Sequence, residues 1–317
     1  MKRMICLILA LAMIFTLAAC GSKEESVVTI ATEVEVEIDE AVAPEESTEE
    51  VTETTEAPVT VYETTETVLV DNEYCTFIVG AASDNELAGM QVEVTCVNKT
   101  REALDFSWSN VSVCGIMYDP MWAVTVPAGE TLVSFVEIDT YALEMIDIRA
   151  ADEITFQLNV LSSENWMDAP YAQGYFTIYP TGLSADRVIY PVREAVASEV
   201  VLVDDDYLTF IIEFVEQQDL DYAVRCYIEN KTLETVMTSW ENVRVNGLEV
   251  DPFWTALIAP GKSAYTQVKF ADSDLKDLGI TTVEEIAFDL MAYDYADWTE
   301  LVSQAVKYQP VEEVALG

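Results

Sequence analysis

Two tryptophans stand where aromatic binding chemistry is possible. Trp122 and Trp254 each end an Asp-Pro-x-Trp stretch. An exposed indole at such a turn would be a stacking platform for a sugar ring or a peptide. Tryptophan is usually well buried, so the same residues also fit the role of core or turn anchors. The sequence leaves both interpretations open, and both residues are candidate binding residues.

A run of acids is the candidate metal site. Asp204, Asp205 and Asp206 could present oxygens to calcium, a hard cation that takes about six to eight such ligands. Aspartate is also a common turn residue between two strands, and a loop of EF-hand spacing is missing from the sequence. Calcium is therefore the one candidate cofactor. The alternative interpretation is that these acids are turn residues and bind no metal.

Composition restricts catalysis. The chain contains no histidine, which removes Ser-His-Asp and Cys-His nucleophilic catalysis. Among 58 acidic residues a nearby carboxylate pair is expected by chance, so a carboxylate-dependent hydrolase is only an alternative. The sequence has no nucleophile elbow, phosphate-binding glycine loop or zinc spacing. It predicts a protein that is not an enzyme.

The charge indicates the class of partner. With 15 basic and 58 acidic residues the net charge is −43. Nucleic acid is excluded as a partner, because phosphate neutralisation needs a basic surface. An acidic surface favours cationic partners, and it is explained equally well as a device for solubility.

The first residues predict a lipid anchor. A positive start at Lys2 and Arg3 is followed by an apolar run, residues 5–17, that is too short to span a membrane. The run ends in small residues before Cys20, which resembles a bacterial lipobox. We therefore expect a signal peptide over 1–19, lipid attachment at Cys20 and a place on the extracytoplasmic face of the bacterial cell membrane. The alternative is an ordinary secretory signal.

Residues 20–66 change character. They are rich in Glu and Thr and nearly free of glycine and base, which predicts a disordered acidic stalk. We interpret the stalk as a spacer; a cation-binding or polyanionic recognition tail is the alternative.

The rest of the chain is one module written twice. The six tryptophans pair at a separation of 132, as Trp108 does with Trp240. The pattern places the first copy at 67–180, a linker at 181–195, the second copy at 196–311 and a tail at 312–317. Whether the linker lets the copies hinge or packs them together stays open.

Each copy predicts short strands. Apolar residues alternate with polar ones, as in Leu208, Phe210 and Ile212, which is typical of a half-buried strand. Asn246-Gly247 predicts a tight turn, and residues 273–279 predict a short helix capped by Ser273. The fold class is therefore all-β, with two tandem immunoglobulin-like β-sandwich modules that each carry one short helix.

The motifs of the second copy, only some of which recur in the first, resemble those of a known kind of protein. They are Asn-Lys-Thr, Asn-Gly, Asp-Pro-x-Trp, Pro-Gly-Lys and Tyr-Asp-x-x-x-Trp, at Asn230, Asn246, Asp251, Pro260 and Tyr293 of the better-matching copy. Together they resemble the immunoglobulin-like modules of clostridial-type surface lipoproteins, in uncharacterised families such as DUF4352 and DUF5067. The resemblance implies a fold and a surface location, and no activity.

Four cysteines remain after the leader. Cys75, Cys96 and Cys226 align with apolar residues of the other copy and are predicted as core residues. Cys114 aligns with Asn246 at a turn and is predicted to be exposed. A disulfide within the first copy is the alternative for these thiols.

These features predict a membrane-anchored lipoprotein that binds a surface protein, peptide or glycan without catalysis. The alternative is an accessory lipoprotein that binds a small ligand or calcium for transport or sensing.

Overall fold

The computed structural model describes residues 66–144, 146 and 148–310, which belong to one unit, residues 57–317. The predicted signal peptide, Cys20 and all but the last residue of the predicted stalk lie outside the described residues. Within the described ranges, no helix has the length and apolar character needed to cross a membrane.

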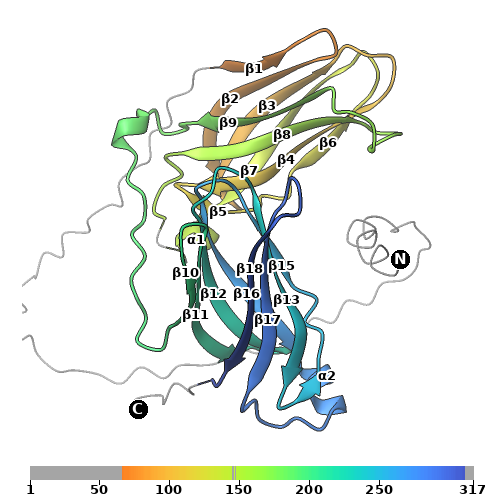
Figure 1. Cartoon of the computed structure of the whole chain (residues 1–317). Coiled ribbons are helices and arrows are strands. Elements are labelled where there is room, and N and C mark those ends of the chain that lie inside the picture. Colours follow the sequence, from red (N-terminus) through yellow and green to blue (C-terminus); the bar gives the residue numbers. More distant parts are fainter. Residues whose placement is uncertain (1–65, 145, 147, 311–317) are drawn as a thin grey trace, which may run out of the picture. The chain divides into compact units, whose positions relative to one another are not determined.

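The first module is built mainly of strands (Figure 1). Its elements are β1 (Thr67–Asp71), β2 (Cys75–Asn85), β3 (Gly89–Asn98), β4 (Leu104–Val113), β5 (Ile116–Met117), β6 (Ala123–Val126), β7 (Thr131–Asp139), α1 (Thr140–Glu144), β8 (Ile154–Ser162) and β9 (Ala172–Ile178).

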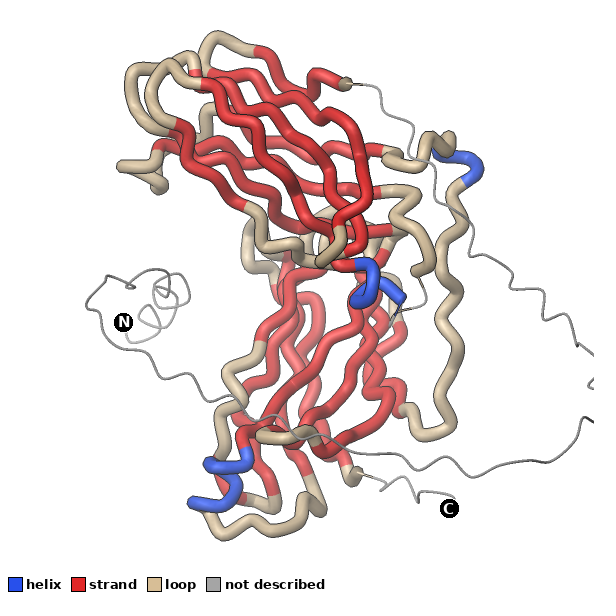
Figure 2. The backbone as a smooth tube through the Cα atoms, turned by 180° about the vertical axis from the view of Figure 1, so that it is seen from behind, coloured by secondary structure: helices blue, strands red, loops and turns tan. Residues whose placement is uncertain are grey.

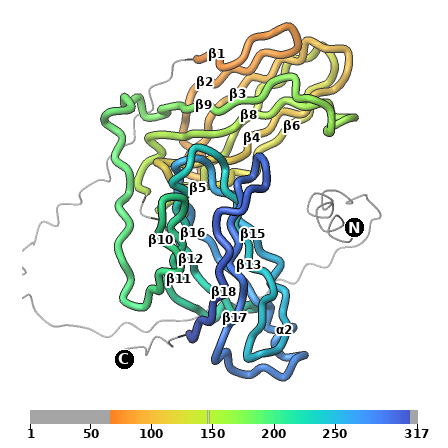
Figure 3. Tube along the Cα trace, in the orientation of Figure 1, coloured from red at the N-terminus to blue at the C-terminus, as the bar shows by residue number. Residues whose placement is uncertain are grey.

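The second module repeats this order element by element (Figure 3). Its elements are β10 (Val200–Asp204), β11 (Leu208–Gln217), β12 (Asp221–Asn230), β13 (Val236–Val245), β14 (Leu248–Glu249), β15 (Thr255–Ile258), β16 (Ser263–Ala271), α2 (Asp272–Asp277), β17 (Ile286–Asp294) and β18 (Glu300–Tyr308).

Each module is a sandwich of two antiparallel sheets, as the sequence predicts. One sheet has the order β1-β2-β3-β7 in the first module and β10-β11-β12-β16 in the second. The other has β8 between β4 and β9, or β17 between β13 and β18, with short strands beside β4 and β13. Helices are confined to short segments such as α1 and α2 (Figure 2).

Alternation along the strands builds the core. On β3 the side chains of Met90, Val92, Val94 and Cys96 are at most 1 % exposed, whereas those between them are half-buried. Period-two burial of this kind places one face of the sheet against the other sheet. Hydrophobic burial between the two sheets is therefore the main stabilising contribution in each module.

A stacked pair of rings lies at the centre of each core. The indole of Trp108 lies 3.7 Å from the ring of Phe156, centroid to centroid, at an interplanar angle of 12°. Trp240 and Phe288 repeat both values in the second module. The repeat in the sequence therefore extends to the packing of the core.

The Asn-Lys-Thr motif forms a buried corner after β3 and after β12. The side-chain amide of Asn230 is fully buried and donates to the carbonyl oxygens of Glu234, Ile258 and Ala259 at 2.8–3.1 Å. Its oxygen accepts from the backbone and the hydroxyl of Thr232. Asn98 repeats this pattern, so the motif satisfies backbone groups that would otherwise be buried without partners.

The predicted turn and helix of the second module are present. Asn246 and Gly247 have φ values of 52° and 82° between β13 and β14, as an Asn-Gly hairpin turn requires. Gly279, at φ 74°, follows the end of α2. The predicted cap is wrong, since α2 begins at Asp272 and Ser273 lies inside it; no side chain caps its start.

The four cysteines of the described residues are free and buried, which disfavours the disulfide alternative. The prediction for Cys114 is wrong: it is 2 % exposed although it occupies the hairpin turn at φ 45°. Its Sγ lies 3.5 Å from the carbonyl oxygen of Ala150, so a segment distant in sequence covers the turn.

Burial of the thiols predicts a loss of stability at high pH. Desolvation raises the pKa of Cys96 from 9.0 to about 12, because the interior disfavours the thiolate. Above the unfolded pKa, the unfolded chain ionises while the folded chain does not, so the free energy of unfolding falls as pH rises toward 12. We expect Cys96→Ala to fall less steeply than wild type in urea titrations followed across this range. Parallel curves for the two proteins would contradict the assignment.

The predicted linker is part of the fold. Val188 is buried in the core of the first module. Arg193 lies 4.9 Å over the ring of Tyr227 and forms ion pairs with Glu199 at 2.5 Å and Glu213 at 3.3 Å. The segment is therefore held by packing and by charge over part of its length.

Candidate functional site

The two candidate binding tryptophans are anchors between sheets. Trp122 is 7 % exposed, donates from Nε1 to Ser134 Oγ at 3.2 Å and meets Trp108 edge to face. Trp254 is half-buried and donates to Thr266 Oγ1 at 3.2 Å. In the first module the indole of Trp122 lies next to β6 in one sheet and donates to β7 in the other, and Trp254 does the same with β15 and β16 in the second module. Each indole therefore connects the two sheets of its module. This packing fits a core anchor and does not fit a stacking platform.

The exposed apolar residue of the Asp-Pro-x-Trp turn is the one before tryptophan. Met121 is 86 % exposed at φ 52°, and Phe253 is 80 % exposed at φ 48°. Asp119 Oδ1 accepts from the backbone N–H of Met121, and Asp251 from that of Phe253, both at 2.8 Å. The sequence does not predict these apolar tips, because Met121 and Phe253 have the apolar character of core residues.

The three candidate calcium ligands do not converge. Asp204 pairs with Lys231 at 2.7 Å and accepts from Thr209, while Asp205 accepts from the backbone N–H groups of the β10–β11 turn. The Lys231 ammonium holds the pKa of Asp204 below its ordinary value. Among the described residues, no group of three or more His, Cys, Asp or Glu is placed to hold a metal. The acids act as turn residues, and the calcium interpretation is not supported.

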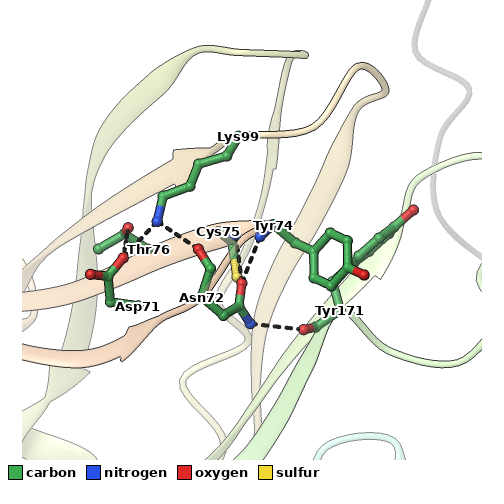
Figure 4. A network of polar contacts seen from close by, with 7 residues as sticks. All are labelled: Asp71, Asn72, Tyr74, Cys75, Thr76, Lys99 and Tyr171. Atoms are coloured by element: carbon green, nitrogen blue, oxygen red, sulfur yellow. Dashed lines mark hydrogen bonds and ion pairs between the residues drawn. The ribbon is translucent and has the colours of Figure 1, made fainter.

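The matching turn of the first module has an additional tie (Figure 4). Lys99 Nζ lies 2.5 Å from Asp71 Oδ1 and 2.7 Å from the carbonyl oxygen of Asn72. Asn72 Oδ1 accepts from the backbone of Tyr74, and Asn72 Nδ2 donates to the carbonyl oxygen of Tyr171 at 3.1 Å. The second module has Asp205 at this position, which offers no donor. The exchange of Asp for Asn therefore couples the hairpin to the loop before β9 in the first module.

Beside this coupling lies an open hollow of about 360 Å³, which we call the tyrosine hollow. Three loops of the first module meet here, namely the β1–β2 turn, the β3–β4 turn and the loop before β9. The rings of Tyr74 and Tyr171 are 5.1 Å apart at 55°. The lining residues are Glu73, Tyr74, Lys99, Thr100, Arg101, Glu102 and Tyr171.

The electrostatics of the tyrosine hollow are mixed. Arg101 is exposed at its rim, and Lys99 is held by Asp71. Glu102 accepts from the hydroxyl of Tyr171 and from Ser162 Oγ. The hydrogen bond to Glu102 raises the pKa of Tyr171, so its phenol stays protonated. The hollow therefore offers aromatic surface, the exposed cation of Arg101, a second cation paired with Asp71, and fixed polar groups.

Such an arrangement suits binding. Tyrosine rings give contact area at low cost in conformational entropy, and the polar groups beside them fix orientation. Glu102 accepts hydrogen bonds from Tyr171 and Ser162, which hold its carboxylate in place beside the rings. Sequence reasoning missed this hollow because its residues are distant in the chain; the Asn72/Asp205 difference between the copies is the signal that could have found it.

A second hollow, of about 710 Å³, lies in the second module beside α2. Its rim includes Pro310, where the described residues end. The tyrosine hollow is lined entirely by described residues, and the proposed function is therefore based on it.

No protein-family model matches the chain, and no curated protein matches it. The geometry of the tyrosine hollow and the sequence carry the functional argument.

Proposed function

We propose that this protein is a non-enzymatic binding lipoprotein of the bacterial cell surface. It is anchored through lipid on Cys20 to the extracytoplasmic face of the membrane and binds a glycan or peptide of a surface partner in the tyrosine hollow. The observation that carries the binding function is the pair of tyrosine rings beside Arg101, in an open hollow.

The anchor rests on the leader. A basic start, a short apolar run and small residues before Cys20 support lipidation, as does the resemblance to clostridial-type surface lipoproteins. Several acyl chains on one residue hold a protein to a bilayer far better than a single chain does.

The hollow favours ligands with a flat apolar face and polar edges. Sugar rings and aromatic or proline side chains of peptides have this character. Exposed Arg101 adds a donor for a carboxylate or hydroxyl on the ligand. In the part of the chain that the structure describes, no group of three or more His, Cys, Asp or Glu is placed to hold a metal, so the binding proposal is preferred to the calcium-binding alternative.

The test is binding of the full chain to glycan and peptide arrays, followed by titration of the strongest ligand. We expect Tyr74→Ala to weaken that ligand about tenfold or more, equivalent to about 1.4 kcal/mol, through loss of ring contact. Tyr207→Ala is the matched control, because Tyr207 is the exposed counterpart of Tyr74 in the second module. Arrays without a ligand, or equal losses for both variants, would refute the proposal.

A further inference from the structure

The two modules meet through a hairpin of the first and a strand edge of the second. The backbone N–H of Ser263, at the start of β16, donates to the carbonyl oxygen of Gly115 at 3.0 Å, and β16 pairs there with β5. Tyr265 packs against the core of the first module. Lys262 Nζ lies 3.4 Å from Glu153 Oε1, and both side chains are largely buried. This contact shows what kind of surface an edge of this module accepts.

The repeat gives the first module the same accepting surface. β7 is the counterpart of β16 and is an edge strand of the sheet β1-β2-β3-β7. Thr131 corresponds to Ser263, and Val133, which is 52 % exposed, corresponds to Tyr265. Phe135, two residues further along β7, is 45 % exposed on the same face. We call Thr131, Val133 and Phe135 the acceptor face.

The acceptor face continues across its sheet. The strand registers align Val133 with Thr95, Thr95 with Ile78, and Ile78 with Val68. In the second module the corresponding Ile211 and Tyr227 are at most 9 % exposed, under the linker and the hairpin. The same row is covered in one module and open in the other.

The charges at the rim of the acceptor face disfavour a second copy of this chain as the protein that covers it. Glu130 stands where the second module has Lys262, and Glu285 stands where the first module has Glu153. A second copy docking its β13–β14 hairpin in the manner of β4–β5 would bring Glu285 against Glu130. Like charges brought together in a partly buried contact disfavour association. Glu93 and Glu137, on the strands of this face, add negative charge.

We propose that the acceptor face docks a sandwich module of a partner protein through a β-hairpin and a Lys or Arg beside it. This basic residue stands at the position of Glu153, just before the strand that corresponds to β8. The edge of β7 supplies backbone groups, Val133 and Phe135 supply apolar contact, and Glu130 pairs with the partner's cation. This surface is separate from the tyrosine hollow, so either can fail without the other.

The chain itself provides the probe. Glu130→Lys recreates the Lys262–Glu153 pair between copies, since the introduced lysine meets Glu285 of a second molecule. Glu285→Lys, just before β17, supplies the proposed basic residue beside the β13–β14 hairpin to Glu130. We expect each single variant to associate at least ten times more tightly than wild type in sedimentation velocity at low salt, and high salt to weaken it. The double variant, with two lysines opposed, is expected to stay as monomeric as wild type.

A further change fixes the location. Val133→Arg in the Glu130→Lys chain is expected to abolish the association, because the apolar contact is lost and a second charge is added. Single variants that remain monomeric would overturn the accepting surface. If the wild-type chain dimerised and Val133→Arg abolished the dimer, the proposed partner would be wrong, since a second copy of the chain would then occupy the acceptor face. All three positions are at least partly exposed. Glu285→Lys removes an ion pair with Lys307 at 3.4 Å, but that pair is solvent-exposed and contributes little, so the fold tolerates these changes.

Discussion

Trp108→Ala is expected to lower the free energy of unfolding of the first module by about 3–5 kcal/mol. The indole is 4 % exposed and stacks on Phe156. Alanine would lose the buried area and leave a cavity between two sheets that strand pairing holds apart, so collapse of the site is limited. Urea unfolding followed by far-UV circular dichroism measures the loss.

The matched control is Trp166→Ala. Trp166 lies in the loop before β9 and is 62 % exposed, so its removal is expected to change the unfolding free energy by about 0.5 kcal/mol or less. Trp240→Ala should reproduce the large loss in the second module, where the stack on Phe288 has the same geometry. Equal effects for Trp108→Ala and Trp166→Ala would contradict the packing argument.

Asn230→Ala is expected to cost about 2–4 kcal/mol, because three carbonyl oxygens and the Thr232 backbone lose their partner in a buried corner. Asn230→Asp should be no milder, since a carboxylate would face those carbonyls. The loss is again measured by urea unfolding of the variant beside wild type.

Lys231→Ala, one residue along, is the control. Lys231 pairs with exposed Asp204 and bonds to the turn of the hairpin, a contact that water and salt screen. We expect a far smaller change than for Asn230→Ala, and a change that shrinks further in salt. If the two variants were equally unstable, the corner would owe its stability to the turn and not to the buried amide.

Much of the fold could be predicted from the sequence because its signals are local or duplicated. Alternation at Leu208, Phe210 and Ile212 predicted β11, and all three side chains are buried. The expectation of a half-buried strand is wrong here, since Thr209 and Ile211 are buried as well and the strand is covered on both faces. The Asn246-Gly247 turn was readable from chemistry, since both residues tolerate positive φ. The fixed spacing between copies carried each assignment from one module to the other.

The wrong exposure of Cys114 and the missed tyrosine hollow share one physical cause, whereas the wrong cap at Ser273 is a local error of one residue. Cys114 occupies a turn, and a turn is exposed unless a distant segment covers it; here the chain near Ala150 does so. The predicted calcium site is wrong, and the tyrosine hollow was missed, because both depend on contacts between segments that are distant in the sequence. Asp204 and Asp205 found nearby donors in the hairpin and in Lys231, and the tyrosine hollow needs Tyr74 and Tyr171 from opposite ends of a module. Hydrophobic periodicity and turn propensity describe a single strand or turn, and they do not predict which distant segment packs over it.

The shortness of the path from chain entry to the tyrosine hollow has a mechanical consequence. β1 enters the first module at Thr67 and reaches the turn beside Tyr74 within one strand, antiparallel to β2. A molecule tethered at its N-terminus and gripped at the hollow would be pulled along the axis of β1. The hydrogen bonds between β1 and β2 would then be sheared together and not unzipped one at a time. Rupture under tension would require the backbone bonds of this five-residue strand to break together, so a weak ligand would detach before the module opened.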